Sequence, residues 1–354
     1  MSHRSVFSGS RNNSRVQALV GTIVFLGSAM SVYSQAGSTG PQGGVKANVP
    51  GTAVVRLDPA LDSIIAPNTK IERVATGFKF LEGPMWHMGR LWFSDLVGNK
   101  LYAVAPDGKV EMLMDHSGGL DSVLPGAYMG SNAMVTDKDH SVLLIQHGKR
   151  RIARLDKNLT ASTFLDRFEN KRLNSPNDLV FAPDGSLWFT DPPFGLPKQN
   201  NDPAKELPFN GVYRYADGKL TAAIKDLPMP NGIGFSADGK TLYISNSGPK
   251  MGVFKYAVSS SGEVSGGTQL IAYPGSAPDV PDGLKIDSAG NVWTTGPGGI
   301  RIITPAGKVL GQIKLPEVAA NLAWAEDGKT LYITASTSVY RLKTLMKGAL
   351  PLYH

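Results

Sequence analysis

The chain contains no cysteine and almost no sign of helix-forming periodicity. Without cysteine it has no disulfide, thiolate zinc site, iron–sulfur cluster or thiol nucleophile, so any chemistry must use oxygen and nitrogen groups. The hydrophobic share of 42% and charged share of 18% indicate a globular protein rather than a disordered one. A length of 354 residues is about twice that of a usual domain, so the chain forms either two domains or one large β architecture.

The sequence also lacks the signals of several classes of partner. The formal charge is +7, but residues 1–36 hold three arginines and no acid, so the rest of the chain has 33 basic and 29 acidic side chains and a net charge of +4. The longest basic run, Lys149-Arg150-Arg151, is predicted to be a solvated turn, and no nucleic-acid partner is expected. The absence of a Walker motif, a dinucleotide fingerprint and a Gly-x-Ser-x-Gly elbow excludes common nucleotide and serine-hydrolase sites.

The N-terminus has the pattern of an export signal. Residues 16–33 form a mostly apolar run after a basic segment, and the small residues Ser34 and Ala36 suit a signal peptidase. We therefore predict a signal peptide over 1–36 and a periplasmic or secreted protein, with a retained membrane anchor as the alternative. Residues 37–50, rich in Gly, Ser and Pro, are predicted to be a flexible linker. No later run is comparable, so we expect no stable membrane insertion once the signal is removed.

Six copies of one pattern begin near residue 71. In each copy a loop with a polar residue leads into an apolar strand, a turn and a second strand. The six second strands, whose centres lie 39 to 55 residues apart, are Arg90–Ser94, Ser141–Ile145, Ser186–Thr190, Thr241–Ser245, Asn291–Thr295 and Thr330–Thr334.

Repeats of this length built from about four short strands indicate β-propeller blades. The sequence thus predicts an all-β fold, a single six-bladed β-propeller over residues 51–354. Two stacked β-sandwiches would not account for six copies. We expect the strand at 71–75 to pair with the last blade, which would close the ring and remove an exposed sheet edge.

Each repeat carries a polar residue before its inner strand. These residues, which are expected to face one end of a central channel, are Glu82, Asn132, Asn177, Asn231, Asp282 and Asn321. One Asn-Gly or Asp-Gly alone is normally a turn, but four residues in register, three of them beside a proline, are hard to explain that way. Buried carboxylates need compensation, and a divalent cation held by carboxylate and amide oxygens would supply it. Such a metal-binding channel favours Ca²⁺, with Mg²⁺, Mn²⁺ and Zn²⁺ as alternatives.

Several stretches resemble a known family. They are Phe80–Trp86, Leu173–Leu179, Trp188–Gly195, Met229–Ile233 and Pro281–Leu284. Together they make residues 71–342 similar to the gluconolactonase/regucalcin (senescence-marker-protein) family of six-bladed propeller hydrolases. The resemblance implies one divalent metal at the channel mouth, bound by Glu82, Asn177, Asn231 and Asp282. It also implies hydrolysis of a small-molecule sugar lactone. A related branch hydrolyses organophosphates, and regucalcin was described as a calcium-binding protein.

The second repeat departs from the family pattern, since Asn132 is followed by Ala133 where many members have glycine. The amide is kept, so Asn132 is predicted to contact substrate or the outer shell of the metal site.

The resemblance implies ring opening by water, with the cation polarising the lactone carbonyl. Asp282 is our choice of general base, although it could serve only as a ligand. His147 could also transfer protons or contact substrate, or be structural, and Arg172 could bind substrate or lie in solvent.

Two long segments, 117–131 and 192–210, are predicted to be loops near the mouth. They would either wall the pocket with Tyr128, Met129, Phe194 and Leu196 or pack as ordinary surface. The competing class is a non-catalytic propeller that binds calcium or another protein. The sequence does not indicate the oligomeric state.

Overall fold

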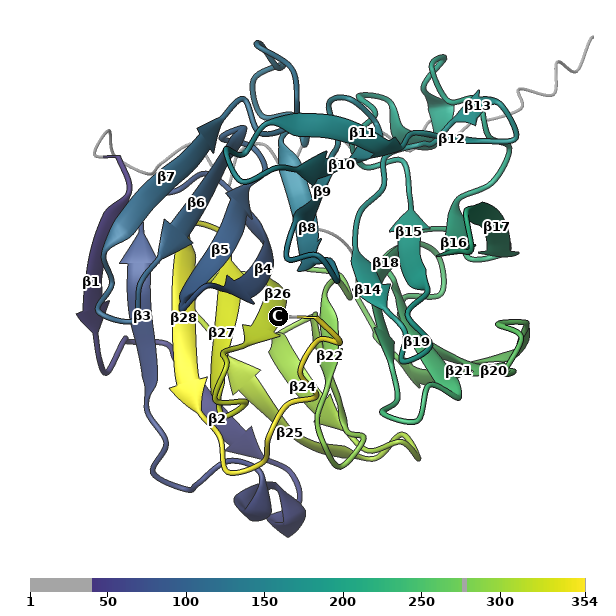
Figure 1. Cartoon of the computed structure of the whole chain (residues 1–354). Coiled ribbons are helices and arrows are strands. Elements are labelled where there is room, and N and C mark those ends of the chain that lie inside the picture. Colours follow the sequence, from purple (N-terminus) through teal and green to yellow (C-terminus); the bar gives the residue numbers. More distant parts are fainter. Residues whose placement is uncertain (1–39, 276–278, 354) are drawn as a thin grey trace, which may run out of the picture. The chain divides into compact units, whose positions relative to one another are not determined.

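The computed structural model describes residues 40–275 and 279–353, which form antiparallel sheets arranged as the six blades of a propeller (Figure 1). Each blade begins with an inner strand and continues outward in chain order. The first two blades are β4 (Leu81–His87), β5 (Arg90–Asp95), β6 (Lys100–Val104) and β7 (Val110–Asp115), then β8 (Ser131–Thr136), β9 (Val142–Gln146), β10 (Arg151–Leu155) and β11 (Ala161–Leu165). The next two are β14 (Leu179–Phe181), β15 (Leu187–Asp191), β16 (Gly211–Ala216) and β17 (Lys219–Ile224), then β18 (Pro230–Phe235), β19 (Thr241–Asn246), β20 (Gly252–Val258) and β21 (Val264–Ala272).

The last two blades have five strands because N-terminal segments join them. Blade five contains β22 (Leu284–Ile286), β23 (Val292–Gly296), β24 (Gly299–Ile303), β25 (Val309–Lys314) and the added β2 (Ala53–Arg56). Blade six contains β26 (Ala319–Trp324), β27 (Thr330–Ala335), β28 (Ser338–Lys343) and the added β3 (Ile71–Thr76) and β1 (Gln42–Lys46). The remaining elements are the ribbon β12 (Arg167–Phe168) and β13 (Lys171–Arg172) and the 3₁₀ turns η1 (Pro59–Ser63) and η2 (Gln199–Asn201). The predicted six-bladed propeller is confirmed.

The ring closes where the sequence predicts. β3 pairs antiparallel with β28 and lies beside it in Figure 1, with Ala75 opposite Val339. The Arg341 Nε donates to Glu72 Oε2 at 2.7 Å across the same pair. A strand from the beginning of the propeller thus covers an edge of its last blade, which would otherwise be open to pairing with another chain.

The predicted flexible linker over residues 37–50 is wrong in part, because β1 lies inside it. This strand pairs with β3, with Gln42 opposite Thr76 and Lys46 opposite Arg73. Its side chains are all exposed, so main-chain pairing holds it rather than apolar burial. The predicted signal peptide over 1–36 lies outside the described residues. Within the part of the chain that is described, no helix combines the length and apolar character needed to cross a bilayer.

The blades are held together by apolar side chains between neighbouring sheets. Between blades two and three, buried Leu143 and Ile145 belong to the same cluster as Phe189 and Tyr213. The Phe189 and Tyr213 rings stack with centroids 5.1 Å apart. Aromatic side chains such as these fill the layers between the blades. The inner strands surround the channel.

Removing the closing strand should prevent stable folding. A chain lacking residues 1–76 loses β1, β2 and β3 and exposes β28, whereas a chain lacking residues 1–50 keeps β2 and β3 and loses the exposed β1 and the buried Val49. We expect the shorter chain to aggregate or to unfold without cooperativity, and the longer one to unfold cooperatively. Size-exclusion chromatography and thermal unfolding by circular dichroism measure both properties, and equal behaviour would show that closure is dispensable.

Candidate metal and active site

The six predicted polar residues all lie at or just before the start of an inner strand. Glu82, Asn132, Asn231 and Asn321 are near the beginning of β4, β8, β18 and β26, while Asn177 and Asp282 each lie two residues before the first residue of β14 and β22. Each inner strand contacts the next around the ring. The six side chains are therefore brought to one level of the channel from segments far apart in the sequence.

Hydrogen bonds link the predicted metal ligands to one another. The Asn132 Nδ2 donates to Asn177 Oδ1 at 2.8 Å, and Asn177 Nδ2 donates to Asn231 Oδ1. On the other side, the Asp282 carboxyl group interacts electrostatically with that of Glu82 and is influenced by the side chain of Asn231. The structure thus brings Glu82, Asn177, Asn231 and Asp282 into one contiguous cluster, with Asn132 attached to it.

The glycines after the acidic residues permit this convergence. A Cβ at Gly83 would lie 2.3 Å from Asn132 O, and a Cβ at Gly283 would lie 2.1 Å from Asn321 Oδ1. Gly83 also has φ of +54°, which disfavours other residues. The Glu-Gly and Asp-Gly pairs are therefore points of close approach between neighbouring inner strands.

A row of hydroxyl groups holds the backbone of the cluster, and the sequence reasoning missed it. The Ser94 Oγ donates to Asn132 O at 2.7 Å, and Thr190 Oγ1 donates to Asn231 O at 2.7 Å. Ser245 Oγ donates to Asp282 O in the same way. Each hydroxyl comes from the second strand of the preceding blade. A Ser or Thr near the end of the repeated second strands is the sequence signal that could have found them.

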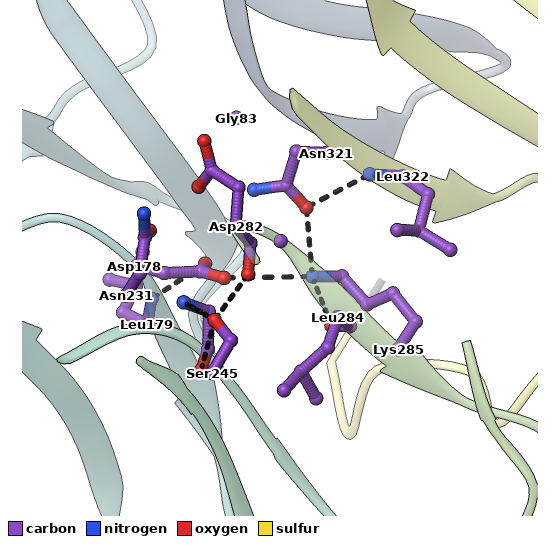
Figure 2. Close-up of polar contacts among 12 residues, drawn as sticks. Gly83, Asp178, Leu179, Asn231, Ser245, Asp282, Leu284, Lys285, Asn321 and Leu322 are labelled. Carbon is purple, nitrogen blue, oxygen red and sulfur yellow. Dashed lines mark hydrogen bonds and ion pairs between the residues drawn. The ribbon is translucent and has the colours of Figure 1, made fainter. Parts of the chain in front are cut away.

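Burial dominates the electrostatics of the site. It raises the pKa of Glu82 to about 7. It also raises the pKa of Asp282, which the charge of neighbouring Glu82 raises further. A third buried carboxylate, Asp178, has its pKa raised by burial, and the ammonium of Lys285 opposes that rise. Asp178 and Lys285 form an ion pair at 3.8 Å beside Asp282 (Figure 2), and neither was among the predicted site residues.

The cluster has the composition of an oxygen site for a cation. Among the described residues no three His, Asp or Glu side chains gather closely enough to hold a metal, so amide oxygens would have to contribute. The buried Asn132 Oδ1 has no hydrogen-bond partner in the structure, and the carboxyl groups of Glu82 and Asp282 interact with each other. Glu82, Asn177 and Asn231 are buried, whereas Asp282 keeps partial exposure to solvent. These residues fit a hard divalent ion.

His147 lies between the two long loops. Its Nδ1 bonds to Tyr128 O at 2.9 Å in the segment 117–131, and its Nε2 lies 3.4 Å from Asn132 Nδ2. A Cβ at Gly195, in the segment 192–210, would lie 2.9 Å from the His147 Cβ, so that loop packs against the histidine as well. Burial lowers the pKa of the imidazole to about 4. The histidine therefore joins both loops to the amide of Asn132.

The predicted wall residues of those loops differ in their surroundings. Leu196 is buried, and the Tyr128 ring lies 5.4 Å from that of Phe80. Phe194 and Met129 are partly exposed. Both loops thus pack onto the propeller with some of these side chains and keep others accessible.

Arg172 makes its hydrogen bonds away from the cluster. Its guanidinium donates to Lys149 O at 2.8 Å, and its backbone N–H donates to Glu206 Oε2 at 2.8 Å. The predicted solvated turn at 149–151 is wrong for Arg150, which is buried and whose Nε donates to Leu173 O at 2.8 Å. Arg150 thus supports the loop that leads to Asn177, and substrate binding by Arg172 stays a prediction.

A cavity of about 360 Å³ occupies the other part of the channel. Its walls come from the later residues of the inner strands, including Trp86, Phe181 and Trp324, and from the C-terminal residues 349–353. Asp178 and Lys285 also line it. This space therefore reaches the ion pair from the side opposite the starts of the inner strands.

Removing one hydroxyl of the row should loosen the cluster. In Thr190→Val the Asn231 carbonyl loses a buried donor, which should lower the free energy of unfolding by roughly 1–3 kcal/mol in urea titrations. The same change at exposed Thr268 on β21 should cost no more than about 0.5 kcal/mol. Equal effects at both positions would contradict a supporting role for the hydroxyl.

Comparison with known proteins agrees with this architecture. The family profile described as SMP-30/Gluconolactonase/LRE-like region matches residues 80–337. The gluconolactonase of Zymomonas mobilis is 34% identical over 327 residues, which cover 88% of this chain and 92% of that protein.

Two solved structures extend the comparison. The gluconolactonase XC5397 of Xanthomonas campestris superposes with a TM-score of 0.75 at 29% identity, covering 87% of this chain and 99% of the other. A calcium-binding protein, regucalcin, from Agrobacterium tumefaciens shares the fold with a TM-score of 0.62 at 18% identity, covering 78% and 94% of the two chains. The chain belongs to the SMP-30/Gluconolactonase/LRE-like family.

Proposed function

We propose that this protein is a metal-dependent hydrolase that opens a lactone, with a sugar lactone of the gluconolactone type as substrate. The observation that carries the proposal is the convergence of Glu82, Asn177, Asn231 and Asp282 in one largely buried cluster of interacting polar side chains. The relatives named gluconolactonase support the reaction class. A lactone is a cyclic ester, so the proposed activity is that of a carboxylic-ester hydrolase.

The proposed ion would be held by oxygen atoms of Glu82, Asn177, Asn231 and Asp282. When bound, it would supply a positive charge that polarises the lactone carbonyl and stabilises the oxyanion. We propose Ca²⁺, because two carboxylates and two amides offer only hard oxygen donors. The relative named as a calcium-binding protein shares this fold, which is compatible with that choice.

Asp282 is the residue best placed to move a proton. It is the member of the four that keeps partial exposure, so its carboxylate is within reach of solvent water. In the proposed reaction Asp282 accepts a proton from the water whose oxygen adds to the carbonyl carbon. It then returns the proton to the ring oxygen as the carbon–oxygen bond breaks. The product is the open-chain hydroxy acid.

His147 is better suited to positioning than to proton transfer. With a pKa of about 4 the buried ring is neutral near pH 7 and a weak base. The carbonyl of Tyr128 accepts from Nδ1–H, which leaves Nε2 to accept from the Asn132 amide. His147 would thus fix the amide that donates to Asn177 Oδ1.

The first experiment is a pH-indicator assay on a panel of five- and six-membered sugar and aliphatic lactones. Acid release should be abolished by a chelator and restored by calcium, since the proposed ion would polarise the carbonyl. Asp282→Asn should lower kcat by roughly 10²–10⁴-fold, because the amide no longer accepts the proton. Asp238→Asn, on an exposed hairpin turn, is the matched control and should keep full activity.

No turnover across the panel, together with tight calcium binding, would favour the non-catalytic calcium-binding propeller. Turnover that resists the chelator would exclude metal dependence. Phosphotriesters in parallel wells test the organophosphate-hydrolysing alternative, which predicts faster release from those esters than from any lactone.

The buried histidine should also make stability depend on pH. Because the folded-state pKa of His147 lies below its unfolded value near 6.5, the unfolded chain binds more protons between pH 4 and 6.5. The contribution of His147 is therefore present above pH 6.5 and is lost as the pH falls. The penalty of His147→Gln on the free energy of unfolding should be about 2 kcal/mol smaller at pH 5 than at pH 7. A penalty independent of pH in urea titrations would mean that the imidazole titrates normally.

A further inference from the structure

Lys285 places an ammonium group among oxygen atoms inside the channel. Its Nζ lies 3.0 Å from Leu284 O, 3.5 Å from Asn321 Oδ1 and 3.8 Å from Asp178 Oδ2 (Figure 2). A main-chain carbonyl, an amide oxygen and a carboxylate are the donor types that hard metal ions take in proteins. The lysine thus lies in surroundings that would also suit an inorganic cation.

Asp178 is the donor of this group that carries a negative charge, and its Oδ2 has the Lys285 ammonium as its partner. The side chain is only 4% exposed, and its Oδ1 accepts from Leu179 N at 2.9 Å. Its Oδ2 is buried without any hydrogen-bond partner and faces the ammonium at ion-pair distance. Without a cation at this position, Asp178 would be a buried charge without compensation, which is strongly destabilising.

The charges of the channel balance only when the lysine is counted. Asp178 interacts electrostatically with both Glu82 and Asp282, so three carboxylates share one environment. One divalent ion at the proposed site together with the Lys285 ammonium carries three positive charges, which matches the three negative ones. Without Lys285 one negative charge would remain.

Asn321 connects the two cation positions. Its Nδ2 donates to Glu82 Oε2 at 3.1 Å, while its Oδ1 accepts from Leu322 N at 2.9 Å and faces the Lys285 ammonium. The lysine position is open to water through the cavity of about 360 Å³, and its side chain is 29% exposed. An ion could therefore reach this position without passing through the first site.

We propose that the Lys285 ammonium occupies a second cation position of the channel, and that removing it opens that position to a divalent ion held by Asp178, Asn321 and the Leu284 carbonyl. Lys285 thereby limits the native chain to one divalent ion. The proposal rests on the contacts of Lys285 itself. It predicts how many ions are gained when the lysine is replaced, so lactone turnover is not part of its test.

The test is a calcium titration of the full chain after chelator treatment, by isothermal calorimetry and by metal analysis. Lys285→Met removes the charge at similar size, and Lys285→Asp adds a carboxylate. Both variants should bind one more calcium ion per chain than wild type, with Lys285→Asp binding it more tightly. Lys240→Met, at an exposed position, is the matched control and should bind as many ions as wild type.

Thermal unfolding keeps the proposal testable if a variant is unstable without metal. Calcium should raise the Tm of Lys285→Asp more than that of wild type, because a second ion binds only the folded state. The same ion count in wild type and folded Lys285→Asp, up to about 10 mM calcium, would overturn the proposal. One ion in the variant and none in wild type would support the lysine position and contradict the proposed metal site at Glu82 and Asp282.

Discussion

Three carboxylates gathered within one channel, two of them buried and the third partly exposed, form the constraint around which the rest of the structure is arranged. Glu82, Asp178 and Asp282 influence one another electrostatically, and the Lys285 ammonium lies beside Asp178. Separating such charges from water is costly unless cations and hydrogen-bond donors surround them. The hydroxyl groups of Thr190 and Ser245 hold the neighbouring backbone, so the cluster is fixed by the walls of the ring as well as by its own contacts.

The propeller is well suited to maintain this unfavourable arrangement. Each blade supplies only one or two polar side chains to the channel, and the rest of its residues pack in layers such as the one around Phe189 and Tyr213. The segments 117–131 and 192–210 lie against this framework, and His147 contacts both of them.

Much of this architecture could be predicted because the repeat is strong and regular. The six second strands and the closing strand at Ile71–Thr76 follow from apolar alternation, and the register of the repeats places Glu82, Asn177, Asn231 and Asp282 together. Other features have no local signal. β1 has no apolar face and depends on main-chain pairing, so its sequence resembles that of a linker.

Lys285 and Arg150 show a second limit of what can be predicted from the sequence. Both are ordinary basic residues in the sequence, and only the tertiary structure reveals that one faces the channel and the other lies buried among carbonyl oxygens. A charged residue is normally expected to be exposed to solvent. The repeat pattern does not show which charged residues are buried against specific partners.

The ring closure has a consequence for how the protein is made. The strand at Ile71–Thr76 is translated well before its partner Ser338–Lys343, because most of the propeller lies between them in the sequence. At usual elongation rates the interval is on the order of tens of seconds. During that time five blades can assemble in order while the first-made strand waits for the sixth. Chaperones that hold the nascent chain extended would act before this final step, and synthesis of Ser338–Lys343 would be the event that allows the ring to close.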